Sequence, residues 1–240
     1  MKSDPKIFFR ELDYYLRYYG NEFKPNQGLE EIIKVVKKYS KNGKWLDLGG
    51  GSNTPFWRMF FPKLKSILCA DINHEAFLLS ELIVNEFIES PCYKQARHMF
   101  GIVENENADI TIQYQKADLL SEEITFDLCF DNVTQFGLLG LLKDENEFVY
   151  KTNEILKCLD VDGVYIGVNW IFSPSYQQKM GFSNGYICKS LISKVETGSY
   201  KVIYYSEEEI KNDPNYEKCI IYVIKNSENA INDIQYNNNN

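Results

Sequence analysis

The stretch KWLDLGGGSNTPF, residues 44–56, determines how the rest of the chain is interpreted. It begins with an apolar run that predicts a buried strand, formed by Trp45, Leu46 and Leu48. Three glycines follow at positions 49–51, and glycine adopts positive φ angles without a Cβ penalty. Candidate helix caps and a first-turn proline come next: Ser52, Asn53, Thr54 and Pro55. The stretch therefore predicts a strand, a tight turn and a helix, a unit that binds nucleotides in open α/β sheets.

Three nucleotide-binding motifs can be compared with this turn. A phosphate-binding P-loop needs Gly-Lys-Ser/Thr, which does not follow Gly51. A dinucleotide fingerprint needs a third glycine where Thr54 stands. The spacing Asp47-x-Gly49-x-Gly51 resembles motif I of the class I S-adenosylmethionine-dependent methyltransferases. In that family the loop lies beneath the methionine part of the cofactor, so the resemblance implies cofactor contacts for Asp47, Gly49, Gly51 and Asn53. A glycine turn without a ligand is the alternative.

Composition limits the class of protein. The chain has 240 residues, 44% of them hydrophobic, which is enough for one sizeable α/β core. The net charge of −8 argues against nucleic acid as a partner. No apolar run reaches the ~20 residues of a membrane span, and the N-terminus lacks the apolar core of a signal peptide, so we expect a cytoplasmic protein. The cysteines form no C-x-x-C pair, so we expect reduced thiols.

The N-terminal segment is rich in aromatic residues at helical spacing. Residues 5–19 predict an amphipathic helix that Gly20 ends, and residues 30–39 predict a second helix. Two interpretations of the first helix remain open: it docks by aromatic packing, or it forms a lid over the site. The resemblance implies that a lid tyrosine meets the cofactor carboxylate, for which Tyr14 is the candidate. Tyr18 and Tyr19 are substrate-contact candidates, and Tyr18 is also a candidate base.

Two further strand ends carry acidic residues. Residues 66–70 predict a buried strand that ends at Asp71, about 20 residues beyond the glycine loop, where an acid can accept both ribose hydroxyls. The sequence ADINHEAF resembles the second motif of the family, which implies cofactor contacts for Asp71 and Ile72. Capping of a helix over residues 73–90 is the alternative role for Asp71. Residues 110–116 predict a third strand, after which Asp118 and Leu119 resemble the adenine-binding motif.

The next strand is predicted at residues 126–130, FDLCF, followed by a helix over residues 145–159. This pattern resembles motif IV of the family, near which methyl transfer occurs. The resemblance implies that Asp131 and Asn132 follow the carboxyl end of the strand and contact the cofactor. Asp131 is also a candidate base, and Phe136 is a candidate wall beside the sulfonium.

The sequence ILKCLDVDGVYIGVN resembles the family's pattern of helix, Gly-Gly turn and strand, with Asp162 in place of the first glycine. We expect Gly163 to supply the left-handed turn residue before a strand at residues 164–168. Residues 169–176, NWIFSPSY, predict an aromatic loop. Its substrate-pocket candidates, for which packing under the loop is the alternative, are Trp170, Phe172 and Tyr176. Residues 201–205 and 219–225 predict a closing hairpin.

The order of these motifs predicts one α/β domain of the Rossmann-like methyltransferase type. The expected sheet is mostly parallel and seven-stranded, with an antiparallel C-terminal strand and helices on both faces. Residues 1–40 would form a helical lid, residues 41–226 the S-adenosylmethionine-binding domain, and residues 227–240 a disordered Asn-rich tail.

The resemblance implies methyl transfer from S-adenosyl-L-methionine to a nitrogen or oxygen of a small molecule, leaving S-adenosyl-L-homocysteine. The sequence shows no metal-ligand pattern, and the scarcity of histidine favours an amine or an acidic hydroxyl as acceptor. Expected partners are a small-molecule acceptor and no nucleic acid or membrane, with a monomer or homodimer as the assembly. The alternatives are a peptide or protein methyltransferase, an aminopropyltransferase-like enzyme and a non-catalytic binder on the same fold.

Overall fold

The computed structural model describes residues 4–85, 90–103, 106–196 and 198–226. Within these ranges the strands are β1 (Gly43–Leu48), β2 (Leu64–Asp71), β3 (Ile112–Lys116), β4 (Phe130–Phe136), β5 (Leu159–Phe172), β6 (Tyr200–Glu209) and β7 (Tyr216–Asn226). All seven of these described strands form one sheet of order β3-β2-β1-β4-β5-β7-β6. Pairing is parallel from β3 to β5, and β7 runs antiparallel to both β5 and β6. This arrangement confirms the predicted fold class.

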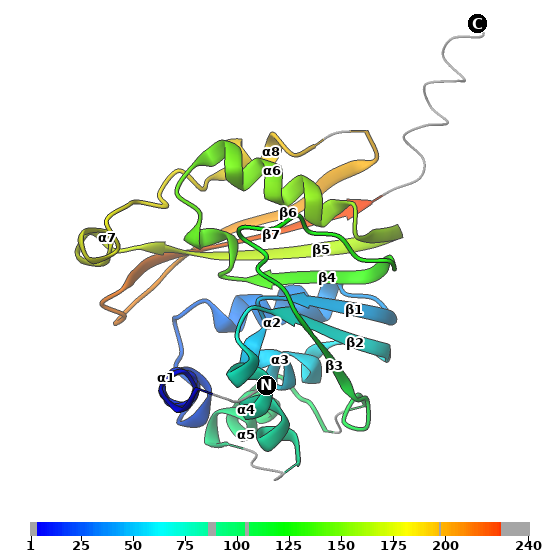
Figure 1. Cartoon of the computed structure of the whole chain (residues 1–240), viewed down its shortest axis with the longest axis vertical. Helices are drawn as coiled ribbons and strands as arrows, with labels where there is room; N and C mark the ends of the chain where they lie inside the picture. Colours follow the sequence, from blue (N-terminus) through cyan, green and yellow to red (C-terminus); the bar gives the residue numbers. More distant parts are fainter. Residues whose placement is uncertain (1–3, 86–89, 104–105, 197, 227–240) are drawn as a thin grey trace, which may run out of the picture.

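Helices cover both faces of the sheet (Figure 1). In chain order they are α1 (Pro5–Tyr15), α2 (Leu29–Tyr39), α3 (Thr54–Trp57), α4 (His74–Asn85), α5 (Pro91–Met99), α6 (Glu145–Leu156), α7 (Pro174–Met180) and α8 (Lys189–Ser193). Short helical turns add η1 (Leu16–Gly20), η2 (Gly51–Asn53), η3 (Arg58–Phe60) and η4 (Leu139–Leu141). Helices α1 to α5 contribute to one core layer, and α6 and α8 contribute to the other.

The two core layers follow from the alternation of side chains along buried strands. In β1, Trp45 belongs to the layer shared with α1 to α5, while Leu46 and Leu48 belong to the layer shared with α6 and α8. Both layers are apolar, because a parallel strand covered on both faces buries every side chain. The carboxyl ends of β1, β2 and β4 therefore meet at one edge of a fully covered sheet.

The predicted position of the fourth strand is wrong. The structure places β4 at Phe130–Phe136, whereas Leu128, in the middle of the predicted strand, is 60% exposed. The strand was predicted at FDLCF because that run is apolar, but the buried strand is the more polar segment that follows. Its polar residues are buried because they find partners: Thr134 accepts a hydrogen bond from the Trp45 indole at 2.8 Å. Asp131 and Asn132 consequently lie at the start of β4.

The fifth strand is longer than predicted and absorbs the expected loop. β5 continues to Phe172, and Ser173 then caps α7 by accepting a hydrogen bond from the Tyr176 amide. The left-handed residue near its start is Asp162, with φ 61°, and not Gly163. A Cβ on Gly163 would lie 2.8 Å from the Asp160 carbonyl oxygen, so the glycine is needed for close backbone approach.

Two helix predictions also need correction. The first helix ends at Tyr15 and continues as the π-helical turn η1, Leu16–Gly20. The single long helix predicted over residues 73–90 is wrong, since α4 covers His74–Asn85 and Ser90 is the extended N-cap of α5. The predicted tail, residues 227–240, lies outside the described residues.

Candidate functional site

The glycine loop is supported from below by a buried carboxylate. Asp47 is 1% exposed, and its two oxygens accept hydrogen bonds from the hydroxyls of Thr54 and Thr134, both at 2.7 Å. A Cβ on Gly50 would lie 2.0 Å from the Asp47 carboxylate, so only glycine fits there. Asp47 thus shapes the loop from within the sheet, while Gly49 and Gly51 supply positive φ angles of 69° and 51°.

Burial determines the protonation behaviour of Asp47. Removal of the carboxylate from water raises its pKa to about 6, and the hydrogen bonds from Thr54 and Thr134 oppose the rise.

Asp71 lies opposite the glycine loop at the end of β2. Its carboxylate accepts a hydrogen bond from the Asn73 amide at 2.8 Å, and a Cβ on Gly51 would lie 3.4 Å from its other oxygen. Burial raises the pKa of Asp71, and backbone amide donors oppose the rise. The missing Cβ of Gly51 leaves this carboxylate directly beside the loop backbone.

The segment after β3 reaches the same edge. The Ala117 amide donates to the Asp71 carbonyl oxygen at 3.1 Å, which places Asp118 and Leu119 beside the end of β2. Asp118 accepts a hydrogen bond from the Ser121 amide at 3.2 Å, and Leu119 is buried. The structure therefore brings together three of the predicted strand-end sites: the glycine loop, Asp71 with Ile72, and Asp118 with Leu119.

Two polar atoms in the glycine loop are buried without a hydrogen-bond partner in the described structure: the Ser52 hydroxyl and the Asn53 side-chain oxygen. Asn53 precedes α3 but makes no side-chain capping bond. Buried polar groups without hydrogen-bond partners cost free energy, so they are expected where a ligand supplies the missing partners. Tyr14 reaches the same place: burial raises its pKa, and a contact with the Asn53 side chain opposes the rise.

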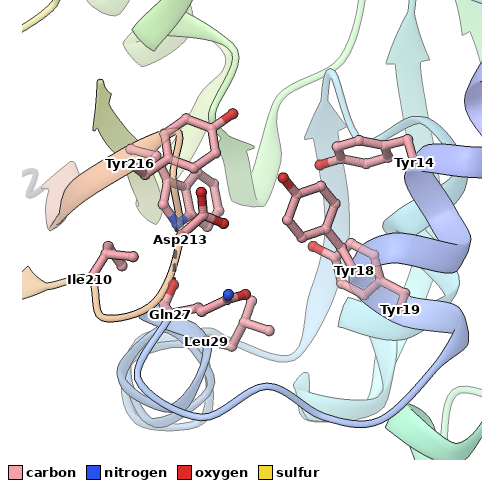
Figure 2. Close-up of a pocket in the computed structure, with 9 residues that line it drawn as sticks. Tyr14, Tyr18, Tyr19, Gln27, Leu29, Ile210, Asp213 and Tyr216 are labelled. Carbon is pink, nitrogen blue, oxygen red and sulfur yellow. Dashed lines mark hydrogen bonds between the residues drawn. The ribbon is translucent and has the colours of Figure 1, made fainter. Parts of the chain in front are cut away.

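A cavity lies beside this loop, between the N-terminal helix and the β6–β7 hairpin. Its volume is about 50 Å³, below the ~300–1,000 Å³ typical of small-molecule sites. Its lining residues are Tyr14, Tyr18, Tyr19, Gln27, Leu29, Trp170, Ile210, Asp213 and Tyr216. Figure 2 shows Tyr14 and Tyr18 on one side and Asp213 and Tyr216 on the other.

Burial and a nearby carboxylate raise the pKa values of the tyrosines that line the cavity. Burial raises the pKa of Tyr18, and the nearby negative charge of Asp213 raises it further. Burial raises the pKa of Tyr216 too, with contributions from Tyr18, Tyr14 and Tyr176. These phenols are therefore protonated at neutral pH.

The substrate candidates separate into two groups. Tyr18, Tyr19 and Trp170 line the cavity. The other three candidates lie outside its lining. The Phe136 ring packs edge-on against Trp57, with ring centroids 4.6 Å apart. Phe172 is 2% exposed, and Tyr176, on α7, packs against its ring. For Phe172 the structure supports packing, because β5 continues through it and places its ring in the core.

Asp131 and Asn132 do not lie at the candidate site, and this prediction is wrong. Asp131 accepts a hydrogen bond from the Lys44 amide at 2.7 Å, and Asn132 bonds to the backbone of Lys41 in both directions. Lys41 and Lys44 flank the start of β1, so both polar residues secure the opposite edge of the sheet from the glycine loop.

Several residues at the site carried no recognisable sequence signal. Asp213, Tyr216 and Gln27 line the cavity from segments without a motif. Glu11 of α1 accepts a hydrogen bond from the Asn73 side chain at 3.3 Å, and burial together with the charge of Asp71 raises its pKa. The aromatic residues of the first helix and Trp170 in the segment 169–176 were the sequence features that pointed toward this region.

Within the described ranges, no group of three or more His, Cys, Asp or Glu side chains is placed to hold a metal ion. In the same part of the chain, no helix has the length and apolar character needed to cross a membrane.

The fold resembles many solved structures. The N-methyltransferase NodS from Bradyrhizobium japonicum WM9, in complex with S-adenosyl-L-homocysteine, is 16% identical, with a TM-score of 0.58 over 93% of this chain and 98% of that chain. The cyclase SpnF is 11% identical, with a TM-score of 0.58 over 92% of this chain and 93% of that chain. A chain of the complex between the Haloferax volcanii Trm112 methyltransferase activator and a putative methyltransferase is 9% identical, with a TM-score of 0.57, covering 95% and 100%.

The chain has the Rossmann-like methyltransferase fold. No protein-family model matches the sequence, and no curated protein sequence matches it significantly. The identities to the solved structures are low, and one of those structures is a cyclase, so the fold alone does not determine the reaction. The reaction depends on the residues of the site.

Proposed function

We propose that this protein transfers a methyl group from S-adenosyl-L-methionine to a nitrogen or oxygen of a small-molecule acceptor. The supporting observation is the glycine loop facing Asp71, with the Ser52 hydroxyl and the Asn53 side-chain oxygen buried and without partners in the described structure. An unpaired hydroxyl and an unpaired amide oxygen next to a glycine backbone fit a polar ligand that lies against the loop.

The residues present fit the parts of this cofactor. Asp71 would accept hydrogen bonds from the ribose hydroxyls, because its carboxylate lies beside the backbone of the glycine loop at the end of β2. Asp118 and Leu119 would flank the adenine. Asn53 and Tyr14 would meet the methionine part, while Asp47 keeps the loop in shape from below.

The bound cofactor supplies an activated methyl group on a sulfonium, so the protein mainly has to position the acceptor and exclude water. Trp170 and the tyrosines of α1 and η1 form the walls that would do this. Tyr18 is protonated at neutral pH, so it donates a hydrogen bond there and does not act as a ready base. This favours an acceptor that needs little assistance from a base.

Residues 1–40 would act as a lid. The cavity of about 50 Å³ is too small for a whole acceptor, so entry requires α1 and η1 to move away from the β6–β7 hairpin. The small volume of the cavity favours a small molecule over a peptide at this position.

Calorimetric titration of S-adenosyl-L-homocysteine tests the cofactor assignment without turnover. We expect wild type to bind it, and Asp71→Ala to weaken the affinity by at least about tenfold, because hydrogen bonds to a carboxylate are lost. Asp131→Ala is the matched control, since it removes a hydrogen-bonded carboxylate at the opposite edge of the sheet.

Equal weakening by both variants would show that the loss follows from general destabilisation. A folded wild-type protein that does not bind S-adenosyl-L-homocysteine would refute the proposal.

A further inference from the structure

The lining of the cavity beside the glycine loop has an unusual composition. Among the described residues that form it, five are aromatic and one is charged: Tyr14, Tyr18, Tyr19, Trp170 and Tyr216, with Asp213. We call this set the aromatic cage. The protonated phenols carry no charge at neutral pH, so the cage has a single anionic group.

Asp213 is available to a ligand. One of its oxygens accepts a hydrogen bond from the Asn215 amide at 2.8 Å, which fixes the carboxylate in the β6–β7 connection. No lysine or arginine within the described ranges forms an ion pair with it. The carboxylate instead faces the cavity across from Tyr18, whose pKa its charge helps to raise (Figure 2).

The aromatic walls are held in place independently of any ligand. The Trp170 indole donates to the Gln27 carbonyl oxygen at 3.2 Å, and a Cβ on Gly137 would lie 3.3 Å from its ring. Tyr216 packs beside it, with ring centroids 6.4 Å apart. Tyr14 and Tyr18 are neighbours across one helical turn, at 5.0 Å. The Lys24 ammonium already lies over the Tyr18 ring, 5.7 Å from its centroid, and aromatic ring faces attract positive charge, so rings beside a carboxylate suit a small cation.

We infer that the acceptor presents a cationic amine, and that Asp213 with the aromatic cage selects it. The inference rests on the proposed methyl transfer and narrows it to nitrogen. A carboxylate or phenolate acceptor would place a second negative charge beside Asp213, which is unfavourable in a partly buried site. The ammonium must lose one proton to solvent water before its nitrogen attacks: the N–H bond breaks, water takes the proton, and the electron pair stays on nitrogen. Asp213 binds and orients the charged form and is not the base.

The size of the cavity agrees with this assignment. About 50 Å³ accommodates an ammonium head but not the whole molecule, so the rest of the acceptor would extend outward. Gln27 also borders an outer groove of about 680 Å³, formed mainly by residues 21–27, which could receive that part.

The test measures binding of benzylamine and of its neutral counterpart benzyl alcohol to the full chain at neutral pH, with and without S-adenosyl-L-homocysteine. We expect wild type to bind benzylamine at least about tenfold more tightly than benzyl alcohol, since only the amine is charged. Asp213→Asn should remove this preference, because the amide keeps an oxygen for the Asn215 amide and loses the charge.

Asp144→Asn is the matched control. Asp144 accepts a hydrogen bond from the Asn146 amide at 2.8 Å, in the same local geometry, but it caps α6 away from the cavity. Its benzylamine affinity should equal that of wild type.

Three outcomes would overturn the inference: equal affinity for benzylamine and benzyl alcohol, an unchanged preference in Asp213→Asn, or no benzylamine binding by protein that binds S-adenosyl-L-homocysteine. The last leaves the proposed function standing. Benzylamine binding by protein that does not bind S-adenosyl-L-homocysteine would instead refute the proposed function, and with it the role of the cage as an acceptor site.

Discussion

Asp47 shows how one residue shapes the glycine loop without facing a ligand. Its carboxylate lies under Gly50 and holds Thr54 and Thr134 on either side. The resemblance to motif I placed an acid here, and the structure explains the chemistry, because a buried carboxylate accepts two hydroxyl donors at once. The cost is that this carboxylate is hard to ionise in the folded protein.

The pKa of Asp47 therefore predicts a pH-dependent stability. Its folded pKa of about 6 lies above the ordinary value of 3.8, so its contribution to stability is fully present below about pH 4 and is lost as the pH rises through about 6. A shift of about two units corresponds to on the order of 3 kcal/mol. Asp47→Asn removes this titration. Urea denaturation between pH 4 and pH 7 should show the stability of wild type falling relative to the variant by roughly that amount.

A wild-type-minus-variant difference that is constant across this pH range would contradict the assignment. The comparison with the variant cancels the titration of the other carboxylates.

At the residue scale, the sequence predicted the site residues that directly follow buried strands. It did not predict the site residues that only tertiary contacts bring to the cavity. Asp71 and Asp118 follow buried strands directly, so their edge of the sheet was predictable. Asp131 was misplaced because its strand was placed too early in the chain. Asp213 reaches the cavity only because the β6–β7 hairpin folds back against α1, a long-range contact that no local pattern encodes.

The aromatic run of the first helix serves two sides of that element. Tyr15 and Tyr19 are each 4% exposed and belong to the core layer, where Tyr19 meets Phe56 at 5.0 Å. Tyr14 and Tyr18 form the neighbouring pair on the cavity side. Tyr15 therefore packs into the core, Tyr14 and Tyr18 face the cavity, and Tyr19 contacts both, so docking and the proposed lid function share this segment.

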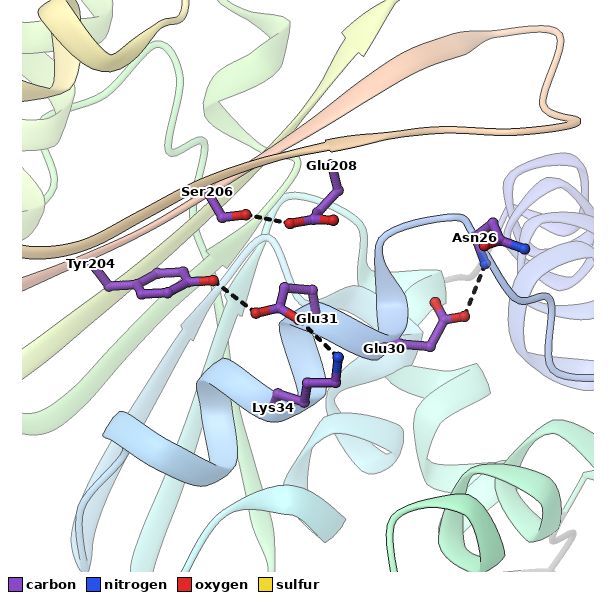
Figure 3. Close-up of polar contacts among 7 residues, drawn as sticks. All are labelled: Asn26, Glu30, Glu31, Lys34, Tyr204, Ser206 and Glu208. Carbon is purple, nitrogen blue, oxygen red and sulfur yellow. Dashed lines mark hydrogen bonds and ion pairs between the residues drawn. The ribbon is translucent and has the colours of Figure 1, made fainter.

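The strand β6 at the edge of the sheet is tied to α2 by a polar cluster (Figure 3). The Tyr204 hydroxyl donates to Glu31 at 2.7 Å, and Lys34 donates to the other oxygen at 3.0 Å. Although burial opposes it, these two donors hold the pKa of Glu31 below its usual range. The cluster fixes the helix that precedes β1 against the last hairpin.

Loss of the Tyr204 hydroxyl should weaken this attachment. We expect Tyr204→Phe to lower the free energy of unfolding by about 1 kcal/mol, because a partly buried hydrogen bond to a carboxylate is lost. Tyr205→Phe is the control in the same strand, since its hydroxyl bonds to Glu207 in an exposed position, and it should cost less than about 0.5 kcal/mol. Urea denaturation of both variants measures the difference, and equal effects would contradict the cluster's role.

At the element scale, the predicted bounds of strands were wrong where polar residues are buried or where apolar residues are exposed. β4 buries Asn132, Thr134 and Gln135, all 0% exposed, so an apolar-run criterion shifts the strand toward the exposed FDLCF segment. β5 was predicted too short because the aromatic segment after residue 168 is compatible both with a loop and with a longer strand. In both cases hydrogen-bond partners on neighbouring strands decided the outcome.

At the scale of the whole molecule, the order of strand-end motifs was sufficient to predict the sheet and its antiparallel strand. Parallel strands need crossover helices, so regular alternation along the chain restricts the topology to few solutions. The cavity was beyond this reasoning, because its walls come from both ends of the chain, α1 with η1 and the β6–β7 hairpin.

The proposed function requires that the carboxyl edge of the sheet around the glycine loop binds S-adenosyl-L-methionine. Hydrogen–deuterium exchange of the full chain with and without saturating S-adenosyl-L-homocysteine tests it in one measurement. We predict slower exchange in residues 49–53, 71–73, 117–119 and 14–19, and unchanged exchange in residues 41–44 and 131–132 at the opposite edge. Unchanged exchange in the glycine loop, or protection confined to the opposite edge, would contradict the account.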